Sequence, residues 1–167
     1  PHELATKMSV WNTSHSIGAS LLAILCGYIM SNMGSDLSGD QQVLGSFYSD
    51  TGLTHSQTLM KMVQDLLNVS NVALDQIDAL AVNAGPGSFT GVRIGTATVK
   101  GLAFNSQKPC IGVSTLEALA YNLKGFDGIL CPVMNARRKQ VYTAIFKQSG
   151  ACTERLLPDS AISIAEL

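Results

Sequence analysis

The segment 77–104 places an apolar strand, a glycine-dense turn and a helix directly after one another. Gly85, Gly87 and Gly91 can adopt a positive φ or let another backbone approach closely, and Pro86 keeps Gly85 out of the α region. A strand that enters a helix through such a turn is typical of α/β proteins, in which the free N–H groups at the helix start often bind phosphate. The residues of this candidate anion site are Gly85, Pro86, Gly87, Ser88, Phe89 and Thr90.

The rest of the chain alternates strands with helices. Apolar residues at helical spacing predict helices at 56–68, 90–104 and 114–123. Capping boxes open two of them, Thr54 with Gln57 and Ser114 with Glu117. Strands are expected at 7–11, 17–24, 43–49, 77–83, 110–113, 128–134, 140–147 and 153–156. This order predicts an α/β fold with a mixed or parallel sheet covered by helices.

Length and charge limit the number of lobes and the kind of partner. The 167 residues, 46% of them hydrophobic, suffice for one full lobe and part of a second. We expect the first lobe at 1–110, with an atypical insertion or loop at 24–42, and the start of a second, truncated lobe at 111–167. A formal net charge of −1 argues against a free-standing nucleic-acid binder, which normally has a basic face. Any role on RNA therefore needs a partner.

An uncharged, mainly apolar stretch between His15 and Asp36 raises the question of a membrane segment. Its apolar part, 17–30, is shorter than the roughly 20 residues that a span needs, and no basic flank or cleavage site of a signal peptide accompanies it. The four cysteines form no Cys-x-x-Cys pair, which favours reduced thiols. We therefore expect a cytoplasmic protein without a membrane segment.

None of the common nucleotide or nucleophile motifs fits the glycine turn. A P-loop needs lysine and then serine or threonine directly after its last glycine, but Val92 and Arg93 follow Gly91. The dinucleotide pattern Gly-x-Gly-x-x-Gly fails by one position, and a nucleophile elbow would need glycine at 86 and 90. Ser88 is explained as a helix-start residue that caps backbone N–H groups. The turn therefore predicts a structural role, with anion binding as the alternative.

Metal ligands are also scarce in this sequence. His2, His15 and His55 are isolated, and none forms the His-x-x-x-His spacing of a metal site. Asn12 and Asn135 stand at strand ends where a carboxylate would be needed to hold Mg²⁺. We expect neither a metal ion nor another cofactor.

A basic cluster, Arg137, Arg138 and Lys139, lies in an expected turn between two strands. A solvated turn is the default interpretation of such a cluster. Arg137 and Arg138 are the candidate contacts for an anion or a partner.

Five sequence blocks match a known family in order and at family spacing. They are GLTHSQTL at 52–59, GPGSFTGVRIG at 85–95, KGLA at 100–103, VSTLEALA at 113–120 and NARRKQVY at 135–142. On these blocks the chain resembles the bacterial TsaB (YeaZ) family, the dimerization subunit of the tRNA threonylcarbamoyladenosine transferase complex.

The resemblance implies an actin-like, Hsp70-like and sugar-kinase-like fold of the ribonuclease H-like class, with two lobes built on mixed sheets. It also implies a noncatalytic scaffold that pairs with a related catalytic subunit (TsaD-like), is joined by a small ATPase (TsaE-like) and contacts tRNA only indirectly. A homodimer is the alternative pairing. The missing His-x-x-x-His pair, which the catalytic relative uses for its metal, favours the scaffold.

By resemblance, the first two helices of the first lobe supply the pairing surface. Gly91, Gly95 and Thr98, at a spacing of three and four, would let another helix approach closely, and tight packing on their own sheet is the alternative interpretation. The candidate partner-binding residues are Thr54, His55, Leu59, Met62, Gly91, Arg93, Ile94, Gly95 and Thr98.

The chain departs from the family pattern at two strand ends. Asn12-Thr13-Ser14 stands in place of Asp-Thr-Ser, and Asn135 occupies a position where Asp is common. Three other functions stay open beside the scaffold. An ATP-dependent acyl- or phosphoryl-transfer enzyme of the same superfold would bind ATP with magnesium, and a glycoprotease-like metallopeptidase would lose its activity to chelators. A homodimeric interaction module would have no tRNA role.

Overall fold

The computed structural model describes residues 6–12, 22–26, 42–49, 55–104, 106–123, 125–150 and 152–167. Close contacts divide the chain into two compact units. The first comprises Pro1–Asn83 with Phe89–Gly112, and the second comprises Ala84–Ser88 with Val113–Leu167. The glycine turn is therefore grouped with the second unit, although the chain on both sides of it belongs to the first.

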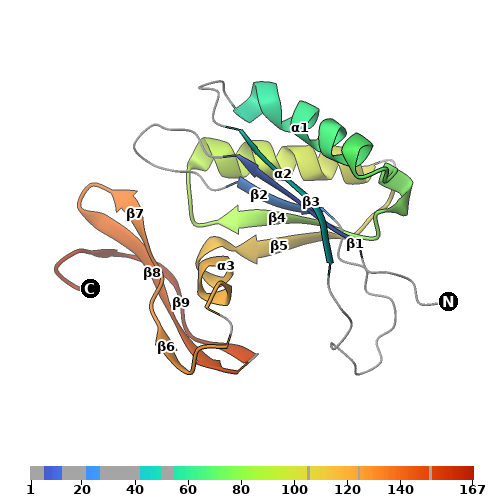
Figure 1. Cartoon of the computed structure of the whole chain (residues 1–167). Coiled ribbons are helices and arrows are strands. Elements are labelled where there is room, and N and C mark those ends of the chain that lie inside the picture. Colours follow the sequence, from blue (N-terminus) through green and yellow to red (C-terminus); the bar gives the residue numbers. More distant parts are fainter. Residues whose placement is uncertain are drawn as a thin grey trace. The chain divides into compact units, whose positions relative to one another are not determined.

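The first unit is built on a five-stranded mixed sheet with the strand order β3-β1-β2-β4-β5 (Figure 1). β1 runs antiparallel to β2 and parallel to β3, and β2 runs antiparallel to β4. Ile24 of β2 pairs with Val10 of β1 on one side and with Val82 of β4 on the other. The strand bounds are β1 Thr6–Asn12, β2 Leu22–Cys26, β3 Gln42–Ser49, β4 Leu80–Gly85 and β5 Cys110–Ser114.

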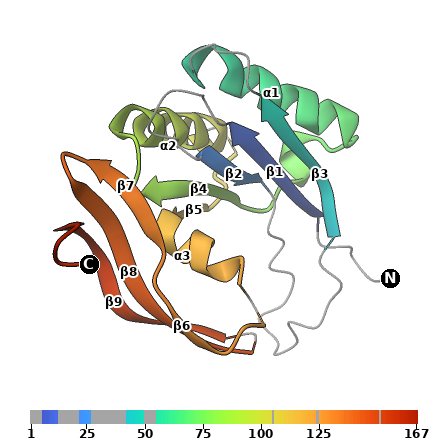
Figure 2. The same ribbon diagram turned by 60° about the vertical axis from the view of Figure 1, so that its left-hand side comes forward.

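Two helices, α1 (His55–Val69) and α2 (Phe89–Phe104), cover the same face of this sheet (Figure 1, Figure 2). Both match their predicted spans to within one residue at each end, because their apolar spacing is maintained over several turns. Full burial of a large apolar side chain contributes about 1.5–3 kcal/mol, so the shared core is the main attachment of the helices to the sheet. It contains Leu59, Met62, Val63, Leu66, Ile77, Leu80, Val82, Val99 and Ala103.

A short 3-10 helix, η1 (Leu74–Gln76), joins α1 to β4 and is held by polar contacts at both ends. Gln76 Oε1 accepts a hydrogen bond from the Ala73 N–H at 2.8 Å. Lys108 Nζ, two residues before β5, donates to the carbonyl oxygens of Asp75, at 3.0 Å, and of Ile77. The ammonium satisfies carbonyl groups that the end of a helix leaves unpaired, and it links the entries of β4 and β5.

The second unit is a four-stranded antiparallel sheet with one short helix, α3 (Thr115–Tyr121) (Figure 2). β8 is central: β6 and β7 pair along one of its edges and β9 along the other. Leu116 and Ala120 of α3 pack against Leu130, Ala144 and Phe146 of the sheet. The strand bounds are β6 Gly128–Leu130, β7 Val133–Arg137, β8 Gln140–Ser149 and β9 Cys152–Ser163.

Two strand predictions are corrected in this unit. The single strand expected at 128–134 is two strands, because Pro132 has no N–H to donate to a ladder. The Pro132 carbonyl instead accepts a hydrogen bond from Thr143 Oγ1 at 3.0 Å. The strand expected at 153–156 is β9, which is 12 residues long and contains Pro158. Within the described residues β9 pairs with β8 alone, and a strand with one free edge tolerates proline.

Part of the predicted N-terminal region lies outside the described residues. The second strand is described at Leu22–Cys26, whereas residues 17–21 of its predicted span are not described. Most of the predicted insertion at 24–42 also lies outside the described residues.

Candidate functional site

The glycine turn Ala84–Ser88 connects β4 to α2. Gly85 has a φ of 108°, a conformation that residues with a Cβ rarely adopt, and its peptide bond to Pro86 is cis. Residues 85 to 88 are half-buried, and Phe89 and Thr90 are exposed. The structure thus gives a physical reason for glycine at position 85, whereas the anion site of the turn stays a prediction.

Arg93 has the guanidinium nearest to the glycine turn in the sequence, and it packs against an aromatic ring of α2. The Arg93 guanidinium carbon lies 5.2 Å from the centroid of the Phe89 ring, within the range of a cation–π contact. Both residues lie on α2, four positions apart. Arg93 and Phe89 therefore form a pair on the helix surface.

One face of α2 is made of small side chains and is buried. Gly91, Gly95, Val99 and Ala103 follow one another at every fourth position, and all four are buried. Val99 and Ala103 belong to the core of the first unit. The small-residue stripe therefore faces the chain's own interior, which is the alternative interpretation stated above, and Gly91 and Gly95 are removed from the candidate contact surface.

Two candidate contacts on α1 are buried in the same way. Leu59 is 1% exposed and Met62 is 4% exposed, and both lie in the core cluster of the first unit. They attach α1 to the sheet and cannot reach a partner directly. Thr54 lies outside the described residues, and His55 is the first residue of α1.

The opposite face of α2 carries the exposed candidates. Arg93 is exposed, whereas Ile94 and Thr98 are half-buried beside it. Phe89 is 75% exposed and Phe104 is 89% exposed, at the two ends of the helix. We define the outer α2 stripe as the exposed residues Phe89, Arg93, Ala97, Lys100 and Phe104. Of the residues in this stripe, the sequence analysis proposed only Arg93 as a partner contact. It missed Phe89 and Phe104, which lie about four helical turns apart and are both exposed.

α1 adds a mixed surface next to this stripe on the same side of the sheet. Met60 is 49% exposed, and Lys61 and Gln64 are exposed as well. Lys61 forms an ion pair with Asp65 one turn later at 3.1 Å. Such exposed pairs contribute little to stability. The exposed side chains Met60, Lys61 and Gln64 leave this face of α1 open to solvent or to a partner.

The turn between β7 and β8 carries the basic cluster, as the sequence predicted. Arg137, Arg138 and Lys139 have φ angles of 66°, 49° and 61°. All three side chains are exposed. The Arg137 N–H donates to Asn135 Oδ1 at 2.7 Å, and the Ile164 N–H donates to the Lys139 carbonyl at 3.2 Å. We call Arg137–Lys139 the basic hairpin; it is fixed by hydrogen bonds at both ends.

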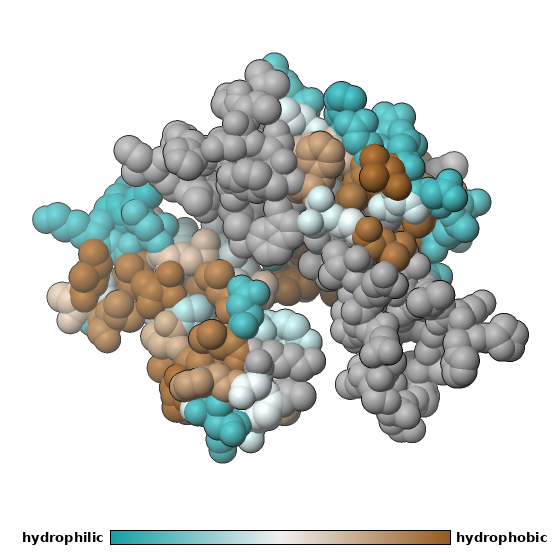
Figure 3. Space-filling model, in the orientation of Figure 1, coloured by the Kyte–Doolittle hydropathy of each residue, from teal (hydrophilic) through white to brown (hydrophobic). Residues whose placement is uncertain are grey.

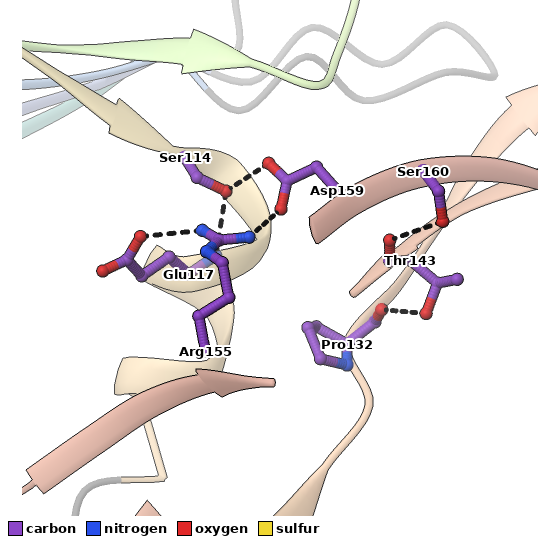
Figure 4. A network of polar contacts seen from close by, with 7 residues as sticks. All are labelled: Ser114, Glu117, Pro132, Thr143, Arg155, Asp159 and Ser160. Carbon is purple, nitrogen blue, oxygen red and sulfur yellow. Dashed lines mark hydrogen bonds and ion pairs between the residues drawn. The ribbon is translucent and has the colours of Figure 1, made fainter. Parts of the chain in front are cut away.

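A polar cluster that the sequence did not predict ties α3 to β9 (Figure 4). Arg155 of β9 donates to Glu117 Oε2 at 2.8 Å and to Asp159 Oδ1, and Ser114 Oγ donates to Asp159 Oδ2 at 2.6 Å. The Arg155 guanidinium carbon also lies 4.7 Å from the ring centroid of Phe146. Burial lowers the pKa of Arg155, but the hydrogen bonds to Glu117 and Asp159 outweigh it and raise the pKa. The guanidinium therefore stays charged and holds the helix to the strand.

Apolar side chains also gather on the second unit, over its strands (brown, lower left in Figure 3). A groove of about 530 Å³ is lined by residues of α3, of β6, of the start of β7 and of the segments that connect them, and no charged side chain is among them. Several of them are well exposed: Leu123, Phe126, Ile129 and Val133. The groove fits apolar side chains better than a polar small molecule.

No three His, Cys, Asp or Glu side chains among the described residues come together as a metal site would require. In the same residues, no helix is both long and apolar enough to cross a membrane.

The order of these elements defines the class of protein. A mixed sheet with the order β3-β1-β2-β4-β5, two helices on one face and a second α/β unit are characteristic of a ribonuclease H-like, actin-like protein. The chain belongs to the family whose model is described as TsaD, tRNA N6-adenosine threonylcarbamoyltransferase, and which matches residues 49–167. The expected fold is thereby confirmed.

Curated relatives agree with the predicted resemblance. The chain is 36% identical over 134 residues to the tRNA threonylcarbamoyladenosine biosynthesis protein TsaB of Bacillus subtilis (strain 168), which is 80% of this chain and 58% of that protein. It is 43% identical over 97 residues to the protein of the same name from Escherichia coli (strain K12), 56% of this chain and 42% of that protein. The chain therefore spans about half the length of these relatives.

A solved structure has the same fold. The protein described as YeaZ from Pseudomonas aeruginosa matches with a TM-score of 0.66 and 24% identity, over 97% of this chain and 69% of that one. At this identity the match concerns the fold alone. Together with the curated relatives it confirms the resemblance to the TsaB (YeaZ) family.

Proposed function

We propose that this chain is a noncatalytic scaffold subunit that supports threonylcarbamoylation of the tRNA adenosine next to the anticodon. It pairs with a catalytic, TsaD-like subunit, and a small, TsaE-like ATPase joins the pair. The relatives named TsaB, at 36% and 43% identity, support this role. The proposed location is the cytoplasm, where such a complex meets tRNA.

The outer α2 stripe is the observation that carries the pairing proposal. Phe89 and Phe104 are 75% and 89% exposed, a large apolar surface at each end of one helix. A cation lies between them, since Arg93 packs on the Phe89 ring. Aromatic and arginine side chains are the residues that most often dominate the binding energy of protein interfaces.

The magnitude follows from the exposed rings. Burying a phenylalanine contributes about 1.5–3 kcal/mol, and 1.4 kcal/mol corresponds to a factor of ten in Kd. Phe104→Asp removes this burial and would place a charge in the contact. We expect it to weaken binding of the catalytic subunit at least about tenfold.

The test is calorimetric titration of the chain with the catalytic subunit from the same organism. Ile164→Asp is the matched control, because Ile164 is 61% exposed and lies in the second unit, after β9. Unchanged binding by Phe104→Asp, in a protein with normal circular dichroism, would show that the pairing face lies elsewhere. Equal losses in both variants would mean that the added charge, and not the stripe, lowers the affinity.

The competing functions have separate readouts. Titration of the chain with ATP and magnesium should give no binding heat, whereas an ATP-dependent transferase would give one. Light scattering of the chain alone measures whether it forms a homodimer, and Phe104→Asp should dissociate a homodimer that uses the same stripe.

A further inference from the structure

We propose that the basic hairpin Arg137–Lys139 binds the phosphate backbone of RNA. The identity of that RNA as tRNA rests on the proposed function, whereas the phosphate chemistry rests on the hairpin itself. These three residues are not part of the proposed pairing surface on α1 and α2.

The backbone of the turn has a conformation that its residue types disfavour. Three consecutive residues with side chains, Arg137, Arg138 and Lys139, all have positive φ. This conformation is unfavourable for residues with a Cβ, and tight hairpins of this kind favour asparagine and glycine. Residues kept in such a conformation cluster at functional sites. The turn therefore carries long cationic side chains where its own stability would favour other residues.

Positive charge is concentrated in this turn. The chain has 11 Lys and Arg residues against 12 Asp and Glu residues, and three of the cations are consecutive here. In the described part of the chain, the ion pairs join Lys61 to Asp65 and Arg155 to Glu117 and Asp159, so none of them neutralises the hairpin.

One carboxylate, Glu166, lies close in the chain to the residue that contacts Lys139, and it has its own hydrogen-bond partner. Glu166 lies two residues after Ile164, whose N–H donates to the Lys139 carbonyl. Glu166 Oε2 accepts a hydrogen bond from the Ser163 N–H at 2.9 Å, and hydrogen bonding to Ser163 lowers the pKa of Glu166. Among the described residues, no ion pair joins Glu166 to any of the three hairpin cations.

The chemistry of the side chains selects phosphate. An arginine guanidinium is a planar fork that can donate two parallel hydrogen bonds to one phosphate group. Two of the three hairpin cations are arginines at adjacent positions, Arg137 and Arg138. Because the net charge of the chain is −1, the hairpin alone should bind RNA weakly and with strong dependence on salt. When the partner subunit already binds RNA, the hairpin would add to the affinity of the complex for that RNA.

The test uses the 167-residue chain and a labelled, unmodified tRNA transcript, followed by fluorescence anisotropy at several salt concentrations. The main variant is Arg138→Asn with Lys139→Gly, which removes two charges and supplies the residues that the turn favours. We expect affinity to fall about tenfold at low salt, and the slope of log K against log salt to become shallower by about 2. We also expect the thermal midpoint to rise by about 2–4 °C, which separates lost binding from lost folding.

Two further variants complete the design. Lys61→Gln with Lys147→Gln removes the same charge from exposed positions outside the hairpin and should keep most of the affinity. Arg138→Lys keeps the charge without the guanidinium fork and should lose less affinity than the neutral variant.

Several results would overturn the proposal. Unchanged affinity in the hairpin variant is one, and equal losses in the hairpin and control variants are another, since net charge alone would then explain them. Displacement of tRNA by inorganic phosphate at matched ionic strength would indicate a site for single phosphate groups. If the hairpin variant no longer binds the catalytic subunit but still binds tRNA, the hairpin is a contact for protein and not for RNA. None of these results depends on the Phe104→Asp titration, so the two proposals fail separately.

Discussion

Arg155 is the residue whose removal best tests how the second unit is held together. We predict that Arg155→Met breaks the polar contacts that join α3 to β9, while the methionine keeps an apolar side chain over the Phe146 ring. The change removes the ion pair to Glu117 at 2.8 Å, the ion pair to Asp159 and the guanidinium contact with the Phe146 ring at 4.7 Å.

The magnitude can be worked out from these contacts. The Arg155 side chain is 31% exposed, and its partners Glu117 and Asp159 are 52% and 27% exposed, so each ion pair contributes about 0.2–1 kcal/mol. The cation–π contact adds about 0.5–1 kcal/mol. The predicted loss is about 1–3 kcal/mol in the free energy of unfolding, or a fall of about 2–12 °C in the thermal midpoint.

The assay is thermal and urea unfolding followed by far-ultraviolet circular dichroism. Lys61→Met is the matched control, because it removes one ion pair, to Asp65 at 3.1 Å, between side chains that are 77% and 36% exposed. That variant should lose no more than about 0.5 kcal/mol. If Arg155→Met is no less stable than Lys61→Met, the cluster does not hold α3 to β9 and the reasoning is refuted.

Three further predictions concern single residues. Ser70→Ala should raise stability by up to about 1 kcal/mol in urea unfolding, because the buried Ser70 Oγ has no hydrogen-bond partner among the described residues. Gly45→Ala should lower stability by about 1–3 kcal/mol in the same assay, since the new Cβ would lie 2.9 Å from Leu66 Cδ1. Glu166, whose pKa is lowered from 4.5 mainly by a hydrogen bond from the Ser163 backbone, contributes stability that is present above that pH and is lost as pH falls further. Glu166→Gln should therefore flatten the acid side of the curve of thermal midpoint against pH, and an unchanged curve would contradict this.

The elements that the sequence predicted well are those with long, regular patterns. α1 and α2 keep one apolar face over about four turns, and the glycine turn between β4 and α2 has the positive φ at Gly85 that explains its residue type. The length of β9 was missed because Pro158 interrupts a pattern that only the pairing with β8 sustains.

The candidate surface was harder to predict than the helices that carry it. A stripe of small residues such as Gly91 and Gly95 suits close approach by another helix or by the chain's own core, and spacing cannot distinguish these two uses. The cluster around Arg155 was missed for a different reason. Its partners are separated by up to 45 positions in the sequence, so only the folded chain brings them together.

We propose that this chain acts by pairing with a catalytic subunit through the outer α2 stripe. The most direct test is reconstitution, in which the catalytic subunit and the small ATPase modify a tRNA transcript with labelled threonine in the absence of the chain, in its presence, and in the presence of its Phe104→Asp variant. Label should enter tRNA only with the unchanged chain, and Phe104→Asp should reduce incorporation in proportion to its loss of binding. Full incorporation without the chain, or with a variant that no longer binds, would contradict this proposal.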